Sequence, residues 1–126
     1  MEELVLSCYK DLRVWKQAVN LALEIYRSTY TFPKHEQYGL VSQMRRASVS
    51  VASNIAEGKG RSSDKEFVLF LHHARGSLLE LETQLLIAAQ LHYLGDSDAD
   101  QLFKLAEGVA KMLNGLINSL RKKEAA

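Results

Sequence analysis

Between Phe67 and Ala88, seven apolar residues recur at alternating steps of four and three without interruption. This spacing follows the 3.6-residue repeat of an α-helix and places all seven side chains on one helix face. A half-buried strand would require alternation with a period of two, which the stretch lacks. The residues are Phe67, Leu71, Ala74, Leu78, Leu81, Leu85 and Ala88. Because helices of this kind gain most of their stability from burying the apolar face, the segment predicts a helix packed against other helices.

Helix breakers divide the rest of the chain into three further helical segments. The breakers are Pro33, Gly58, Gly60 and Gly95. Asp11 is expected to cap the first helix, and Ser63 with Glu66 forms a predicted capping box for the third. The predicted helices span residues 12–31, 34–57, 63–93 and 97–122 of a single domain, residues 1–126. Long helices joined by short connections predict an all-α, antiparallel, up-down-up-down four-helix bundle.

Apolar residues exceed what one buried stripe per helix requires. In the first helix we predict a buried seam of Leu12, Trp15, Val19, Ala22 and Tyr26. Further apolar residues lie off the predicted seams of the first and third helices: Val14, Leu21, Leu23, Ile25, Val68, Leu69, Leu79 and Leu86. Surplus apolar surface is typical of a partner interface, so we expect a homo-oligomer. Gly108 and Gly115, seven residues apart, are expected to mark a close helix approach.

The overall composition excludes several classes of protein. With 126 residues, of which 47% are hydrophobic and 25% charged, the chain has the profile of a globular domain. Cys8 is the sole cysteine, which excludes an internal disulfide and a cysteine-based zinc site. No apolar run approaches the roughly 18 residues of a membrane span. Since Met1-Glu2-Glu3 is acidic where a secretory signal is basic, we expect a cytoplasmic protein without a membrane partner.

A polar line runs through the otherwise apolar second helix. Its four members are spaced by four, four and three residues and therefore share one helix face. They are Arg46, Ser50, Asn54 and Glu57. The predicted fold places Ser77 and Glu80 of the third helix opposite this line. We interpret these six residues as a buried polar network that fixes helix register; a ligand or partner site and a catalytic site are the alternatives.

The histidines do not have the spacing of a metal site. Bundles with di-iron centres carry Glu-x-x-His pairs on two helices, and no glutamate here is followed by histidine at the third position. His72 and His73 are adjacent, so they point about 100° apart on a helix and cannot jointly hold one ion. The sequence therefore predicts no catalytic residues, no metal and no cofactor.

Basic residues gather near the turn between the second and third helices. They are Arg45, Arg46, Lys59, Arg61 and Lys65. Arg121, Lys122 and Lys123 form a second group, which an up-down-up-down bundle brings to the same end. Solvated helix ends explain many such charges. The functional alternative is contact with RNA or DNA phosphates through charge and shape, without base readout.

Several short motifs occur in a specific order along the chain. They are Asp11-Leu12-x-Val14-Trp15, Phe32-Pro33, Glu36-x-Tyr38-Gly39-Leu40, Gln43-x-Arg45-Arg46-Ala47, Asn54-Ile55-Ala56-Glu57-Gly58-x-Gly60-Arg61, Phe70-Leu71, Ala74-x-Gly76-Ser77 and Glu80-Leu81-Glu82-Thr83. Through these motifs the chain resembles the 23S rRNA intervening-sequence protein family, a family of small bacterial four-helix bundles. A relative of that family is the accessory variability protein of diversity-generating retroelements.

The resemblance implies a ring-shaped homo-oligomer, typically a pentamer, without known enzymatic activity. The retroelement relative is understood to bind nucleic acid and a reverse transcriptase through a basic surface, which directs attention to Arg45, Arg46 and Arg61. The leading hypothesis is a non-enzymatic accessory protein that binds RNA or DNA through repeated basic patches. The competing hypothesis is a protein-interaction scaffold that does not contact nucleic acid.

Overall fold

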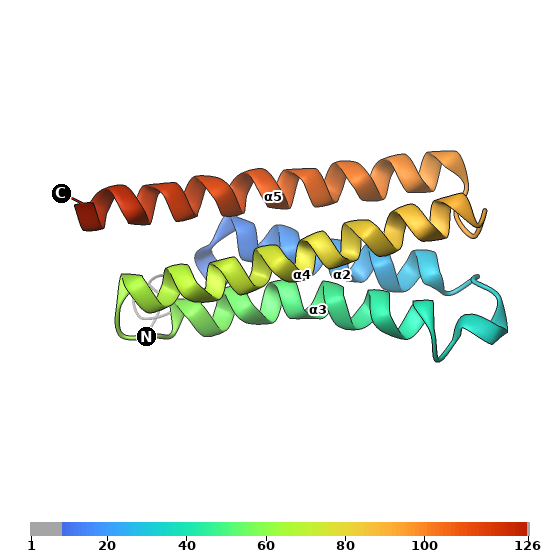
Figure 1. Ribbon diagram of the computed structural model, residues 1–126, viewed down its shortest axis with the longest axis horizontal. Helices are drawn as coiled ribbons and strands as arrows, with labels where there is room; N and C mark the ends of the chain where they lie inside the picture. The colour runs from blue at the N-terminus through green and yellow to red at the C-terminus, as the bar shows by residue number, and fades with distance from the viewer. Residues whose placement is uncertain (1–8, 126) are drawn as a thin grey trace.

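Four long α-helices make up most of the computed structural model, which describes residues 9–125 (Figure 1). They are α2 (Arg13–Thr29), α3 (Leu40–Lys59), α4 (Asp64–Gln90) and α5 (Asp96–Ala125). Two short 3₁₀-helices, η1 (Tyr9–Asp11) and η2 (Lys34–Glu36), precede α2 and α3. No strand occurs among these residues, so the prediction of an all-α fold with four helices is confirmed. The expectations for Cys8 and for Met1-Glu2-Glu3 concern a segment outside the described residues.

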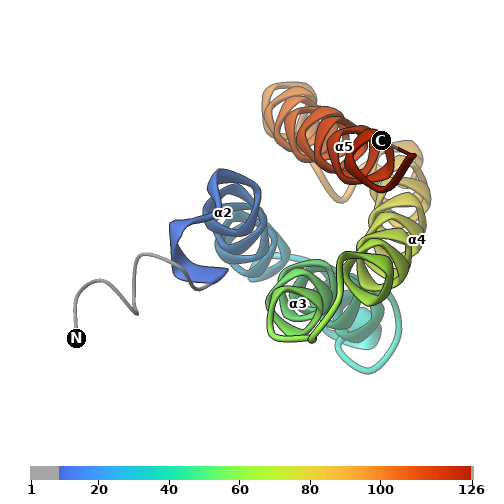
Figure 2. The ribbon, with the colours of Figure 1, turned by 90° about the vertical axis from the view of Figure 1, so that its left-hand side faces the viewer.

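The helices lie side by side, with α2 diagonal to α4 and α3 diagonal to α5 (Figure 2). α3 and α4 pack together most extensively, and α2 and α5 least. At one end, Nζ of Lys123 on α5 lies 3.3 Å from Oδ2 of Asp64 at the start of α4. At the other end, the hydroxyl of Tyr93 donates to Oε2 of Glu36 in η2 over 2.9 Å. The pair of Lys123 and Asp64 shows that the α3–α4 turn lies beside the last turns of α5.

The core contains every residue of the seam predicted for α4, all of them buried. The seam predicted for α2 is wrong. The side chains that α2 buries are Val14, Ala18, Leu21, Ala22, Ile25 and Thr29. Trp15, Val19 and Tyr26 of the predicted seam each follow a buried residue by one position, which turns them about 100° around the helix axis. Except for Ala22, the members of the predicted seam are only partly buried or exposed. α2 thus carries two apolar stripes, and the one with Trp15 and Tyr26, whose polar tips seek water, stays at the surface.

The bounds of α3 differ from the predicted helix 34–57 at both ends. Pro33 and η2 turn the chain first, and α3 begins at Leu40 after Gly39. At its other end α3 continues through Gly58, which was expected to stop it. A Cβ atom at position 58 would lie 2.6 Å from Cβ of Phe70 and 3.0 Å from Cδ1 of Phe67. Gly58 therefore marks a close approach between α3 and α4 instead of a helix end.

The helix caps confirm one prediction and correct another. Ser63 caps α4, and its Oγ accepts a hydrogen bond from the backbone N–H of Glu66 over 3.2 Å. The N-cap of α2 is Leu12, because Asp11 already belongs to η1.

The close approach expected at Gly108 and Gly115 is absent, since a Cβ at either position would meet nothing within 4 Å. None of the described helices has the length and hydrophobicity that crossing a bilayer requires.

The contact between Glu36 and Tyr93 should make this end of the bundle sensitive to acid. The backbone N–H of Leu40 and the Tyr93 hydroxyl both donate to the Glu36 carboxylate and hold its pKa below 4.5. Because the folded chain then binds this proton less readily than the unfolded chain, the stabilisation is present above the unfolded-state pKa and is lost as pH falls through the lowered value. Tyr93→Phe removes one donor. We expect NMR titration to show the pKa of Glu36 closer to 4.5 in this variant, and an unchanged pKa would contradict the assignment.

Candidate functional site

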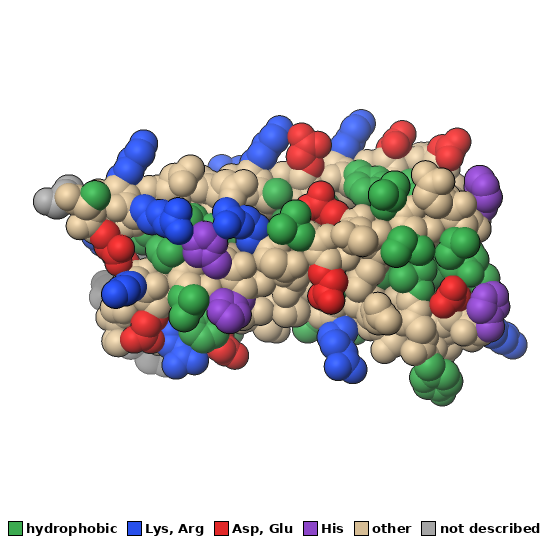
Figure 3. Space-filling view, viewed as in Figure 1, with side chains coloured by type: hydrophobic (Ala, Val, Ile, Leu, Met, Phe, Trp, Pro, Cys, Tyr) green, Lys and Arg blue, Asp and Glu red, His purple; other side chains and the backbone are tan. Residues whose placement is uncertain are grey.

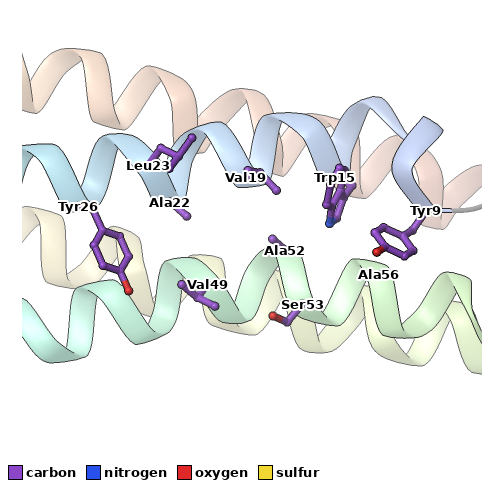
Figure 4. Close-up of a pocket in the computed structure, with 10 residues that line it drawn as sticks. All are labelled: Tyr9, Trp15, Val19, Ala22, Leu23, Tyr26, Val49, Ala52, Ser53 and Ala56. Carbon is purple, nitrogen blue, oxygen red and sulfur yellow. The ribbon is translucent and has the colours of Figure 1, made fainter.

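An open apolar groove, the α2–α3 groove, lies between the outer faces of α2 and α3 (Figure 4). It encloses about 370 Å³. Its lining comprises Tyr9, Trp15, Val19, Ala22, Leu23, Tyr26, Val49, Ala52, Ser53 and Ala56. Tyr9 and Trp15 pack edge to face at one end, with ring centroids 5.1 Å apart, and Tyr26 lies at the other end. Four residues of the predicted α2 seam, all except Leu12, thus line a groove that is accessible to a partner.

A second apolar surface, the α4 leucine patch, consists of Leu69, Leu79 and Leu86. The exposed fractions of Leu79 and Leu86 are 60% and 53%. Figure 3 shows hydrophobic side chains at intervals along the face that α4 presents. Since α4 is diagonal to α2, this patch and the α2–α3 groove lie on different sides of the bundle (Figure 2). Two separate surfaces are therefore available for contacts with other chains.

Three of the six residues in the predicted polar network meet between α3 and α4. The Oγ atoms of Ser50 and Ser77 are 2.9 Å apart. Nδ2 of Asn54 donates to Oγ of Ser50 over 3.1 Å and to its carbonyl over 2.9 Å. Two turns further along α4 from Ser77, Gln84 is buried, and its Oε1 has no hydrogen-bond partner among the described residues. The serine pair links the two most extensively packed helices and favours one register between them.

The three charged members of the predicted network do not join this cluster. Arg46 and Glu80 are exposed. Glu57 is also exposed, and its Oε2 lies 3.7 Å from Nη2 of Arg61 one turn later. A charged group buried without a partner costs far more free energy than a hydroxyl or an amide. The long side chains at the edge of the α3–α4 contact consequently extend into solvent, and the neutral ones remain inside.

Three basic residues, the α3–α4 turn cluster, surround the turn between α3 and α4: Lys59, Arg61 and Lys65. All three are exposed. Nζ of Lys59 lies 5.8 Å from the ring centroid of Phe67, and Cζ of Arg61 lies 4.7 Å from that of Phe70. Such cation–π contacts restrain the side chains while leaving their charge accessible. The pairing of Lys123 with Asp64 brings the basic end of α5 to the same place, as the sequence predicted.

Arg45 and Arg46 do not belong to this cluster, contrary to the sequence-based grouping. They lie about 20 Å away along α3, because thirteen residues at 1.5 Å each separate Arg46 from Lys59. Nε of Arg45 donates to Oγ1 of Thr29 over 3.0 Å, and its guanidinium lies over the ring of Tyr26 at 4.7 Å. Arg45 therefore fastens the last turn of α2 to α3. Arg46 lines a separate hollow that also contains Tyr38.

His72 lies between two arginines that the sequence analysis did not connect with it. Its Nδ1 is 2.9 Å from Nη2 of Arg75, and its Nε2 is 2.8 Å from Nη2 of Arg121. Nη1 of Arg75 donates to Oδ1 of Asn114 over 3.1 Å. Partial burial lowers the pKa of His72, and the charges of Arg75, Arg121 and His73 lower it further. The spacing of these residues could have indicated the cluster, because His72 and Arg75 share one face of α4, and Asn114 and Arg121 share one face of α5.

This histidine is not part of a metal site. Between residues 9 and 125, no three side chains of histidine, cysteine, aspartate or glutamate come together in a way that could hold an ion. The two arginines beside His72 are also unsuited to a cation.

Residues 10–115 match the family model described as 23S rRNA-intervening sequence protein. The chain belongs to this family. Its family membership confirms the resemblance seen in the motifs, whereas the link to the retroelement protein stays a prediction. A comparison with curated proteins found no match. The fold of this family member is similar to the crystal structure of a protein with unknown function from the S23 ribosomal protein family of Bacteroides thetaiotaomicron. The TM-score is 0.75 at 20% identity, covering 82% of this chain and 97% of that one.

Proposed function

We propose that this family member is a non-enzymatic accessory protein whose antiparallel, up-down-up-down bundles assemble into a ring and contact RNA or DNA. The observation that carries the proposal is the α3–α4 turn cluster, which holds three exposed cations at one end of the bundle beside the basic end of α5. The net charge of one chain is only +1. Binding therefore depends on repeating this local cluster around an oligomer, which the family resemblance suggests is a pentamer.

Two apolar surfaces support the assembly. In a ring, one patch on each subunit contacts a different patch on the next. The α2–α3 groove is concave, whereas the α4 leucine patch is carried on the outside of a single helix on another side of the bundle. We propose that the leucine patch of one subunit occupies the groove of its neighbour. Trp15 and Tyr26 in the groove are of the residue types enriched at such interfaces.

The nucleic-acid contact is proposed to be electrostatic. Lys59 and Lys65 can each neutralise a phosphate, and so can Arg61 when a phosphate replaces Glu57 as its partner. The cluster offers no exposed aromatic ring on which a base would stack, since Phe67 is buried and Phe70 lies under Arg61. Binding should consequently show little sequence preference. It should also weaken as salt is added, because each phosphate contact releases condensed counterions.

We expect Lys59→Gln/Arg61→Gln/Lys65→Gln to weaken nucleic-acid binding and to flatten its salt dependence. Loss of three phosphate contacts should reduce the slope of log K against log salt by about 2 to 3 for each protomer engaged. Fluorescence anisotropy with duplex DNA and structured RNA at several salt concentrations measures this slope. Arg45 is left intact because it holds α2 against α3. The matched control is Lys16→Gln/Lys104→Gln/Lys111→Gln, which removes three exposed cations elsewhere.

A protein-interaction scaffold is the second candidate, favoured by aromatic exposure at the end of the bundle remote from the cluster. Tyr38 lies beside Arg46 and is 97% exposed. A bundle that acts only through its basic end has no use for an exposed aromatic side chain at the other end. The resemblance to the retroelement protein makes a reverse transcriptase a candidate partner. Absence of nucleic-acid binding at low salt by an assembled ring would reject the first proposal in favour of this one.

A further inference from the structure

We infer that His72, Arg75 and Arg121 form a binding site for a phosphate oxyanion on the seam between α4 and α5. Figure 3 shows basic side chains on both sides of a histidine over these two helices, toward the end where α5 finishes. The site uses none of the residues of the α3–α4 turn cluster. It does not depend on the proposed nucleic-acid binding, because a free phosphate would meet the same three groups.

The hydrogen-bonding roles around His72 leave an acceptor missing. A guanidinium group only donates, and a neutral imidazole has one donor nitrogen and one acceptor nitrogen. Both ring nitrogens face a guanidinium nitrogen, at 2.9 Å for Arg75 and 2.8 Å for Arg121. Whichever tautomer is present, one of these two contacts places N–H against N–H. An oxyanion at that contact would accept from the imidazole N–H and from the guanidinium that faces it, so that both donors have a partner.

The charge around the site favours an anion. No carboxylate lies within ion-pair distance of Arg75 or Arg121 in the stretch 9–125, where the ion pairs involve other cations. The neighbours of His72 on α4 are His73 and, in an adjoining hollow, Lys65 and Glu66. The groups around His72 thus include one carboxylate, Glu66, and three cations, Lys65, Arg75 and Arg121. The local balance is positive although the whole chain is almost neutral.

The geometry of the donors points to phosphate among the anions. Asn114 accepts from Nη1 of Arg75 and so orients that guanidinium, while Arg121 reaches His72 from the other helix. The donors therefore come from two helices and from both sides of an imidazole ring. A tetrahedral phosphate offers oxygens in several directions, whereas a planar carboxylate offers two in one plane. Arginine also recognises phosphate through more than one N–H group.

The test is NMR of protein labelled with ¹³C-histidine, titrated with inorganic phosphate against chloride at matched pH and ionic strength. The four histidines give separate signals, so His35 and His92 serve as internal references. We expect saturable shifts at His72. A bound phosphate should also raise the pKa of His72, opposite to the effect of burial and of the neighbouring Arg75, Arg121 and His73.

Arg75→Gln/Arg121→Gln should raise the dissociation constant for phosphate by about tenfold or more, as the loss of charge-assisted hydrogen bonds requires. Arg121→Gln alone, near the exposed end of α5, serves if the double variant is not folded. Arg27→Gln on α2 is the matched control and should leave phosphate binding unchanged. A His72 signal that moves no more with phosphate than with chloride would overturn the inference, as would equal binding by the Arg121→Gln variant.

A second titration with a short single-stranded RNA distinguishes the source of the phosphate. Saturable shifts at His72 with both ligands support the site and identify a phosphodiester as a ligand. Shifts with inorganic phosphate but not with RNA also support the site and assign it to free phosphate or a phosphomonoester. That second result, with no RNA binding by anisotropy, would reject the proposed function while leaving this inference intact.

Discussion

Gly58→Ala is expected to lower the free energy of unfolding by about 1–2 kcal/mol, because overpacking a well-packed contact costs up to about 3 kcal/mol and alanine returns about 1 kcal/mol of helix propensity. The added methyl would lie 2.6 Å from Cβ of Phe70 and 3.3 Å from the carbonyl oxygen of Phe67, so α4 would have to move away from α3. Phe67 is buried, and no flexible side-chain end lies nearest to the methyl. The usual gain of about 1 kcal/mol on replacing a helical glycine by alanine is therefore outweighed.

Urea denaturation followed by circular dichroism at one fixed protomer concentration measures this effect, since assembly also contributes to stability. Gly115→Ala is the matched control. It makes the same change inside α5, where a Cβ would meet nothing within 4 Å, and should stabilise the protein by about 0.5–1 kcal/mol. If Gly58→Ala were as stable as the parent protein, the close approach of α3 and α4 at this position would be disproved.

The contrast between these glycines shows where sequence patterns stop being informative. The regular spacing of Gly108 and Gly115 suggested a close approach, and the position of Gly58 next to Gly60 suggested a helix end. A glycine in a sequence shows only that a side chain is absent at that position. Whether it serves backbone conformation or packing depends on the neighbouring helix, which in this case places Phe67 and Phe70 against position 58.

The two apolar stripes of α2 illustrate the same limit. The seam of α4 could be predicted because its seven residues recur without interruption from Phe67 to Ala88, whereas the other apolar residues of α4, such as Leu69 and Leu79, form no such series. α2 offers two heptad series one residue apart, and spacing alone cannot say which faces the core. For the candidate site, Ser50, Asn54 and Ser77 were expected as three members of a six-residue network, and the hydrogen bonds join these three without the charged members. The position of His72 between Arg75 and Arg121 needed the register of α4 against α5, which one sequence does not supply.

Val49→Glu is expected to convert the proposed ring into folded monomers. Val49 lines the α2–α3 groove and is 42% exposed, so in a single bundle a glutamate there remains in water and costs little. In a ring the neighbouring subunit would cover it and leave a charge without a partner, which is strongly unfavourable. Light scattering measures the mass, and circular dichroism checks that the helices persist. Asn118→Glu, an exposed position on α5, is the matched control and should retain the parent mass.

A head-to-tail contact makes a sharper prediction for mixtures. Leu79→Glu alters the α4 leucine patch and should also yield monomers, since Leu79 is 60% exposed in the bundle and would be covered in the ring. The Val49→Glu variant keeps an intact patch and the Leu79→Glu variant keeps an intact groove. Mixing the two should therefore restore one contact per pair and give dimers that cannot extend further. Monomers in the mixture would show that groove and patch do not contact each other, and an unchanged mass of Val49→Glu alone would remove the groove from the interface.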